Sequence, residues 1–168
     1  MDNNYIFQYW EAIQDGTVTV GKWIKTIYEI LVNGLKSGKW DFDEEKANKA
    51  INFIENFCHH SEGRNDLLKL ELWQKAIVSA IFGIMDKRTG YRQFREVFIV
   101  VARKNGKTLF AAAIAAYMAY IDGEYGAKVY FLAPKLDQAD LVYDAFYQIV
   151  QADDELDSIT KKRRSDIY

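Results

Sequence analysis

The tripeptide Gly106-Lys107-Thr108 contains the residue types that bind nucleotide phosphates. In a phosphate loop, backbone N–H groups surround the phosphate oxygens, a lysine reaches the β and γ phosphates, and a hydroxyl binds Mg²⁺. The usual pattern has another glycine five residues before the second one, and this chain has Val101 there. The tripeptide is therefore a variant, and taken alone it is better explained as a loop glycine beside a helix N-terminus.

The segments on either side of the tripeptide favour the phosphate interpretation. Residues 97–101 are a short, β-branched apolar run, which predicts a strand buried on both faces. An alanine-rich stretch over 107–121 predicts a buried helix, and residues 128–132 predict a second strand. Strands joined in this way are parallel with a right-handed crossover, and the helix dipole directs positive charge at an anion.

The remaining pattern predicts further helices and one domain boundary. Apolar residues at helical spacing predict helices between Tyr5 and Cys58, from about Leu70 to Phe82, and after Pro134. Asp41 stands three residues before Glu44, which predicts a capping box at the start of the third helix. A polar stretch, 59–65, predicts the boundary between a helical N-terminal segment (1–62) and the domain with the loop (63–168). The fold class is therefore α/β, with an incomplete β-α-β core of the P-loop NTPase type after an α-helical segment.

Charge and composition narrow the classes of function. The 168 residues have a net charge of −2, so any nucleic-acid surface must be a local patch. The apolar run 109–121 is shorter than the roughly 20 residues that cross a bilayer, so we expect no membrane span. The single cysteine, Cys58, predicts a reducing, intracellular setting. We reject a metal site at Cys58-His59-His60, because adjacent histidines rarely bind one ion and no second ligand pair appears.

A local excess of positive charge surrounds the loop. Between residues 87 and 107, one acid, Glu96, accompanies seven basic residues: Lys87, Arg88, Arg92, Arg95, Arg103, Lys104 and Lys107. Arg103 and Lys104 lie on the loop itself, where either could add charge at the γ phosphate during transfer. Arg88, Arg92 and Arg95 could contact DNA phosphates or a neighbouring subunit, or could form a solvated face.

Several segments together resemble the large terminase subunit of tailed bacteriophages, the ATP-driven motor that packages DNA. They lie between about residues 55 and 150. The five segments are Leu72-Trp73-Gln74, a connector formed by Phe82-Gly83 with Gly90-Tyr91-Arg92-Gln93-Phe94-Arg95, Ala102-Arg103-Lys104-Asn105-Gly106-Lys107-Thr108, Asp122-Gly123-Glu124-Tyr125-Gly126-Ala127-Lys128-Val129-Tyr130 and Ala133-Pro134-Lys135-Leu136-Asp137-Gln138-Ala139. Five segments in the family's order are far more specific than any one of them. Terminases commonly replace the first glycine of the loop, so its absence here agrees with the resemblance.

The resemblance implies a site and a set of partners. It implies that Gln74 reads the edge of adenine, and that the loop Arg103, Lys104, Asn105, Gly106, Lys107 and Thr108 binds ATP. Arg103 and Lys107 are then catalytic candidates, and Thr108 is the Mg²⁺ ligand. The implied partners are double-stranded DNA, the small terminase subunit, the portal protein and further copies in a homo-oligomeric ring. The implied location is the cytoplasm of an infected or prophage-bearing bacterium.

Part of the family pattern is missing from the sequence. No apolar strand ending in Asp-Glu follows Thr108, although such a Walker B strand helps to hold Mg²⁺ and activate water. Asp153-Asp154-Glu155 lacks a preceding apolar run, so we interpret it as a solvated helix end. The cluster of carboxylates of a nuclease domain is also missing. We therefore expect an N-terminal part of a terminase ATPase, whose parent also has endonuclease activity, that is inactive alone.

Two alternatives stay open at this point. One is another P-loop protein, such as a helicase-like translocase or a kinase. The other is a non-catalytic module whose N-terminal helices bind partners.

Overall fold

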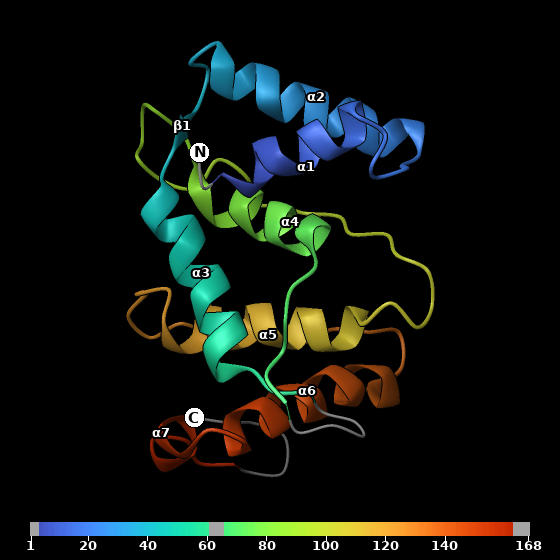
Figure 1. Ribbon diagram of the computed structural model, residues 1–168. Helices are drawn as coiled ribbons and strands as arrows, with labels where there is room; N and C mark the ends of the chain where they lie inside the picture. Colours follow the sequence, from blue (N-terminus) through green and yellow to red (C-terminus); the bar gives the residue numbers. More distant parts are fainter. Residues whose placement is uncertain (1–3, 61–65, 163–168) are drawn as a thin grey trace. The chain divides into compact units, whose positions relative to one another are not determined.

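A computed structural model describes residues 4–60 and 66–162 (Figure 1). The chain divides into two compact units: the first comprises Met1–Ile51 and Leu70–Ile99, and the second comprises Asn52–Lys69 and Val100–Tyr168. Each unit is thus built from two separate stretches of sequence. The predicted boundary at residues 62/63 lies outside the described residues, and this division stays a prediction.

Helices dominate both units. In chain order, the elements are α1 (Tyr5–Gln14), α2 (Lys22–Lys36), β1 (Asp41–Phe42), α3 (Glu44–Phe57), α4 (Leu72–Gly83), β2 (Ile84–Met85), α5 (Lys107–Tyr120), α6 (Leu136–Gln151) and α7 (Asp154–Ser158). The helices predicted from apolar spacing are therefore confirmed. No helix in the described ranges is both long enough and apolar enough to cross a membrane.

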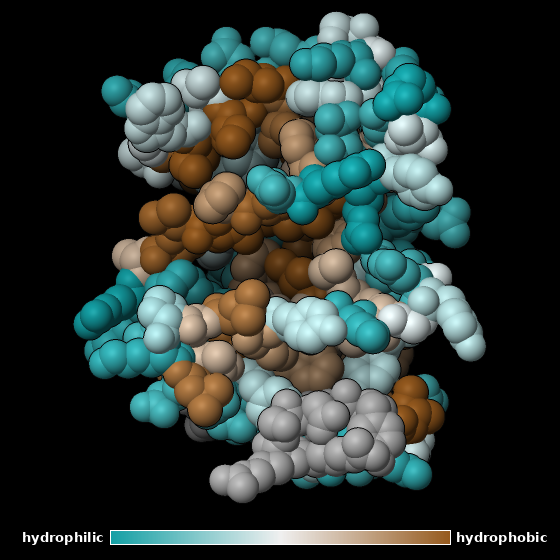
Figure 2. Space-filling view, turned by 180° about the vertical axis from the view of Figure 1, so that it is seen from behind, coloured by the Kyte–Doolittle hydropathy of each residue, from teal (hydrophilic) through white to brown (hydrophobic). Residues whose placement is uncertain are grey.

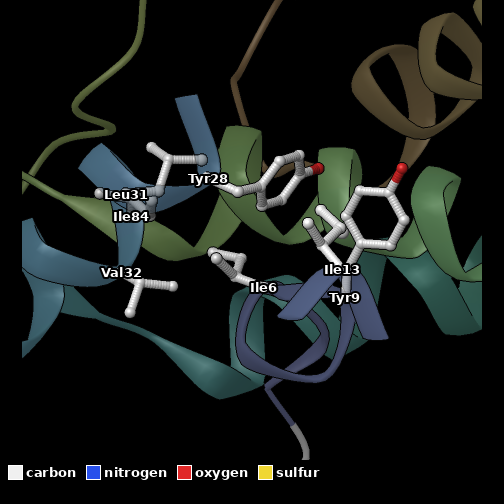
Figure 3. Close-up of a cluster of buried hydrophobic side chains, with 8 residues drawn as sticks. Ile6, Tyr9, Ile13, Tyr28, Leu31, Val32 and Ile84 are labelled. Carbon is white, nitrogen blue, oxygen red and sulfur yellow. The ribbon is translucent and has the colours of Figure 1, made fainter. Parts of the chain in front are cut away.

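The first unit has a core between α1, α2 and α4 (Figure 3). Its buried residues are Ile6, Tyr9, Ile13, Tyr28, Leu31, Val32, Ala76 and Ile84. The rings of Tyr9 and Tyr28 meet edge to face with centroids 4.8 Å apart, an arrangement that aromatic quadrupoles favour. Helical spacing on α1 and α2 places these side chains on facing stripes, which explains why both amphipathic helices form.

The start of α3 differs from the prediction. Asp43 Oδ1, rather than Asp41, accepts a hydrogen bond from the Lys46 N–H at 3.0 Å, directly before the helix begins at Glu44. Asp41 instead lies in β1, which pairs antiparallel with β2, and its carboxylate contacts Lys87 Nζ at 3.3 Å. Because Asp41 is part of the strand pair, it does not cap α3. The predicted capping box at Asp41 is therefore wrong.

The second unit is organised by α5 against α6. Five of the buried positions of α5 are Ala112, Ala113, Ala115, Ala116 and Phe110. Small side chains let two helix backbones approach closely, and Ile149 and Val150 of α6 are also buried in this unit. The Tyr120 and Phe146 rings stack with centroids 6.1 Å apart, and Tyr120 Oη lies 2.8 Å from Thr160 Oγ1. The alanine run therefore fixes the helix that follows the candidate loop.

The two predicted parallel strands do not form in the described chain. Residues 97–101 and 128–132 belong to no strand, and the only sheet among the described residues is the antiparallel pair β1-β2. Phe98 and Val100 are more than 90% exposed, and so is Leu132. Figure 2 shows apolar residues, coloured brown, exposed on the surface of the molecule. A strand needs hydrogen-bonding neighbours, and these runs have none among the described residues, so the expectation of buried strands is wrong for this structure.

Gly83 sits where α4 meets β1 and α3, which gives the first testable prediction. A Cβ added there would lie 2.6 Å from the Phe42 ring and 2.9 Å from Ala47 Cβ. We expect Gly83→Ala to lower the free energy of unfolding by about 1–3 kcal/mol through overpacking, measured by urea denaturation. Gly21→Ala is the control because nothing lies within 4 Å of its added Cβ; equal losses in both variants would contradict this packing.

Cys58 gives a second prediction in the other unit. Its thiol is fully buried, and burial, with a smaller effect of the Asp153 charge, raises its pKa from 9.0 to about 12. The neutral thiol is thus favoured by folding, so its contribution to stability is complete below pH 9 and is lost as the pH rises towards 12.

At pH 8 the folded chain should therefore label very slowly with a thiolate-specific reagent. The expected thiolate fraction is on the order of one in ten thousand when folded and about a tenth when unfolded. The chain has one cysteine, so absorbance of the released chromophore reports this residue alone. Labelling of the folded chain as fast as in denaturant would contradict the buried position.

Candidate nucleotide phosphate site

The candidate loop lies in the second unit, directly before α5. Residues 102–108 are all exposed, and α5 begins at Lys107 with Gly106 as its N-cap. No side chain caps this end of the helix. The first N–H groups of α5 are therefore free of the usual side-chain acceptor and, together with the helix dipole, favour an anion here.

Backbone conformation gives the loop its shape. Lys104 and Gly106 have φ values of 65° and 66°, while Arg103 and Asn105 have negative φ. Alternation of this kind turns successive backbone N–H groups towards one concave side, which forms an anion-binding nest. A left-handed conformation costs a residue with a Cβ roughly 1–2 kcal/mol, and Lys104 is the one non-glycine with positive φ among the described residues. Strain of this kind gathers at functional sites.

Three side-chain hydrogen bonds close the loop on itself. Lys107 Nζ donates to the Ala102 carbonyl at 3.0 Å. Asn105 Nδ2 donates to the Ala102 and Arg103 carbonyls, both at 3.2 Å. The lysine that the sequence assigns to phosphate is thus held by the loop's own backbone.

The residues that could hold a metal ion are few. No group of three or more His, Cys, Asp and Glu side chains gathers in the described part of the chain. Thr108, exposed at the second position of α5, offers a hydroxyl oxygen, the kind of hard ligand that Mg²⁺ accepts beside phosphate oxygens and water. The residues present therefore fit a magnesium ion that is held mainly by its nucleotide.

Gln74 belongs to the first unit and has a structural contact there. Its side chain is 8% exposed, and its Oε1 accepts the Glu71 N–H at 2.9 Å while the Glu71 carboxylate accepts from the Gln74 N–H. This reciprocal pair caps the start of α4. The structure thus brings together 103–108 on one loop, and it assigns Gln74 to a separate unit.

The acidic run after α6 is a helix terminus, as the sequence indicates. Asp153 Oδ1 accepts from the Glu155 and Leu156 N–H groups at 3.1 and 2.9 Å, and so caps α7. Sequence reasoning did not predict two features of the loop, the left-handed Lys104 and the Asn105 contacts. The tendency of asparagine to bond nearby backbone was the available signal for the second.

The comparisons with known proteins show the family of the chain. The family model for the terminase large subunit, ATPase domain, matches residues 72–168, a range that includes the whole loop. The chain therefore belongs to the family of terminase large subunits, and the matched part is the one that the family model describes as the ATPase domain. No curated protein matches it.

A solved structure is similar as well. The large terminase of bacteriophage HK97 shares 26% identity with this chain and superposes with a TM-score of 0.60. The match covers 71% of this chain and 24% of the HK97 chain, so the matched part of this chain corresponds to about a quarter of that protein's length.

The left-handed N-cap gives a third prediction. Gly106 and Gly21 are both N-caps without a side-chain cap, and neither has an atom within 4 Å of an added Cβ. Only Gly106 has positive φ, because Gly21 has φ −70°. We expect Gly106→Ala to lower the free energy of unfolding by about 1 kcal/mol more than Gly21→Ala, measured by urea denaturation. Equal effects would show that residue 106 does not need the left-handed conformation.

Proposed function

We propose that this chain binds ATP through residues 103–108, as the nucleotide-binding part of a terminase motor that packages double-stranded DNA. The main support is one coincidence: the family match includes a loop whose backbone alternates in the manner of an anion nest at an uncapped helix start. The same coincidence disfavours a purely partner-binding module.

Each loop residue has a distinct role in this proposal. Lys107 leaves the Ala102 carbonyl and neutralises the β and γ phosphates, where its charge counts most. Thr108 would hold Mg²⁺ through its hydroxyl, and the ion would supply charge that offsets the phosphate oxygens. Arg103 and Lys104, both exposed on the same loop, would add positive charge near the γ phosphate, where charge stabilises transfer.

We infer that Gln74 contributes to the choice of adenine. The capping box uses Oε1 of its amide, which leaves the amide N–H groups for an adenine nitrogen.

In a protein as long as the HK97 terminase, residues 97–101 and 128–132 would pair with further strands in a parallel sheet and bury their apolar side chains.

Two of the basic residues before the loop are engaged within the first unit. Lys87 contacts Asp41, and the Arg92 guanidinium lies over the Phe82 ring at 5.3 Å. Arg88 and Arg95 are the remaining candidates for DNA phosphates. The family resemblance also supports the proposed partners and location. The partners are the small terminase subunit, the portal protein and further copies of the chain in a ring, and the location is the bacterial cytoplasm.

We propose that residues 1–168 bind nucleotide without turning it over. Beyond Thr108 the sequence has no apolar run ending in Asp-Glu to hold Mg²⁺ and activate water. Endonuclease activity, which the family resemblance implies for the parent protein, is a further part of this proposal.

Removal of the lysine charge tests the phosphate assignment. We expect Lys107→Ala to weaken binding of a non-hydrolysable ATP analogue with Mg²⁺ by about 10- to 100-fold, the effect of one charge-assisted hydrogen bond. Isothermal titration calorimetry measures this.

Lys135→Ala is the matched control, because Lys135 is also an exposed lysine at a helix start in the same unit. The control should bind as the unaltered chain does. Equal affinity of Lys107→Ala and Lys135→Ala would show that the loop does not bind the phosphates.

A further inference from the structure

The Ala102 carbonyl accepts hydrogen bonds from two side chains of the same loop. Lys107 Nζ lies 3.0 Å from it and Asn105 Nδ2 lies 3.2 Å from it, and the same Nδ2 also lies 3.2 Å from the Arg103 carbonyl. An asparagine amide has two N–H groups, which matches two carbonyls. We propose that Asn105 is a positioning residue, which holds these carbonyls in place while Lys107 moves from Ala102 to a phosphate. This inference rests on the proposed function.

The geometry of the peptide bond explains what this contact controls. In a trans peptide, the carbonyl of one residue and the N–H of the next point in opposite directions. Fixing the Ala102 carbonyl therefore fixes the Arg103 N–H, and fixing the Arg103 carbonyl fixes the Lys104 N–H. Both N–H groups then lie on the side of the loop away from the Asn105 amide. That arrangement keeps the nest donors in place before any phosphate arrives.

The same contact lowers the cost of releasing Lys107. When the lysine moves to a phosphate, the Ala102 carbonyl loses a charged donor. The Asn105 amide remains as a donor to that carbonyl, so the backbone group is still paired. Alanine at 105 offers no donor, and an ionised aspartate offers only acceptors that repel both carbonyls and phosphate.

Binding measurements on three single variants test this role. We expect Asn105→Ala to weaken binding of the Mg²⁺-bound ATP analogue about fivefold at every pH, from the loss of neutral hydrogen bonds. Asn105→Asp should bind more weakly still at pH 7.5. As the pH falls towards 4, its protonated carboxyl regains a donor, so its affinity relative to the unaltered chain should rise above that of Asn105→Ala.

The control deletes the same kind of bond elsewhere in the second unit. Asn56 Nδ2 donates to the Asn52 carbonyl at 2.8 Å within α3, so Asn56→Ala should leave nucleotide affinity unchanged. Hydrogen exchange at neutral pH gives a readout that needs no ligand. Amides of residues 102–106 should exchange faster in Asn105→Ala than in the unaltered chain, whereas those of α6 should not change.

The outcomes separate this inference from the proposed function. If Lys107→Ala weakens binding and Asn105→Ala changes neither affinity nor loop exchange, only the positioning role is overturned. A defect in Asn105→Asp that disappears at low pH, with Asn105→Ala normal, is a pure charge effect and also overturns it. If Lys107→Ala has no effect on binding, the phosphate site itself is wrong. Faster loop exchange in Asn105→Ala would then still support the hydrogen bonds from Asn105 to the two carbonyls.

Discussion

The left-handed backbone at Lys104 and Gly106 is the constraint on which the proposed phosphate site depends. Without it, the chain from residue 102 could not reverse into α5 with its N–H groups on one side. Glycine adopts this conformation without penalty, but Lys104 does not. The bonds from Asn105 and Lys107 to the Ala102 carbonyl offset part of that cost. The strained turn therefore depends on these side-chain contacts within the same loop.

The loop can hold this shape only because α5 is fixed behind it. The alanine face of α5 packs against α6, and the Tyr120 contacts with Phe146 and Thr160 fix its far end. The apolar side chains of α5 thus perform no chemistry, yet they set where Lys107 and Thr108 stand. In the first unit, the Gln74 amide also has a structural role, because it caps the start of α4.

The sequence predicts those parts of the structure that depend on local pattern. Apolar spacing predicted the helices, and the Gly-Lys-Thr tripeptide predicted the start of α5. The buried strands at 97–101 and 128–132 were wrong here, because β-branched composition signals a strand only when other strands pair with it. The predicted cap at Asp41 was wrong because Asp41 lies in β1, where it pairs with Met85 of β2. The family resemblance is confirmed, since several ordered segments are more specific than one motif. The Asn105 contacts depend on the backbone angles of the loop, which sequence pattern does not supply.

The proposed binding of the ATP phosphates by residues 103–108 can be tested directly. Titration of the ¹⁵N-labelled chain with Mg²⁺ and a non-hydrolysable ATP analogue, followed by two-dimensional NMR, tests it residue by residue. We expect the largest shifts of backbone amides at Gly106, Lys107 and Thr108, with smaller changes at Arg103 and Lys104. Saturable binding whose shifts leave this loop unchanged would contradict it.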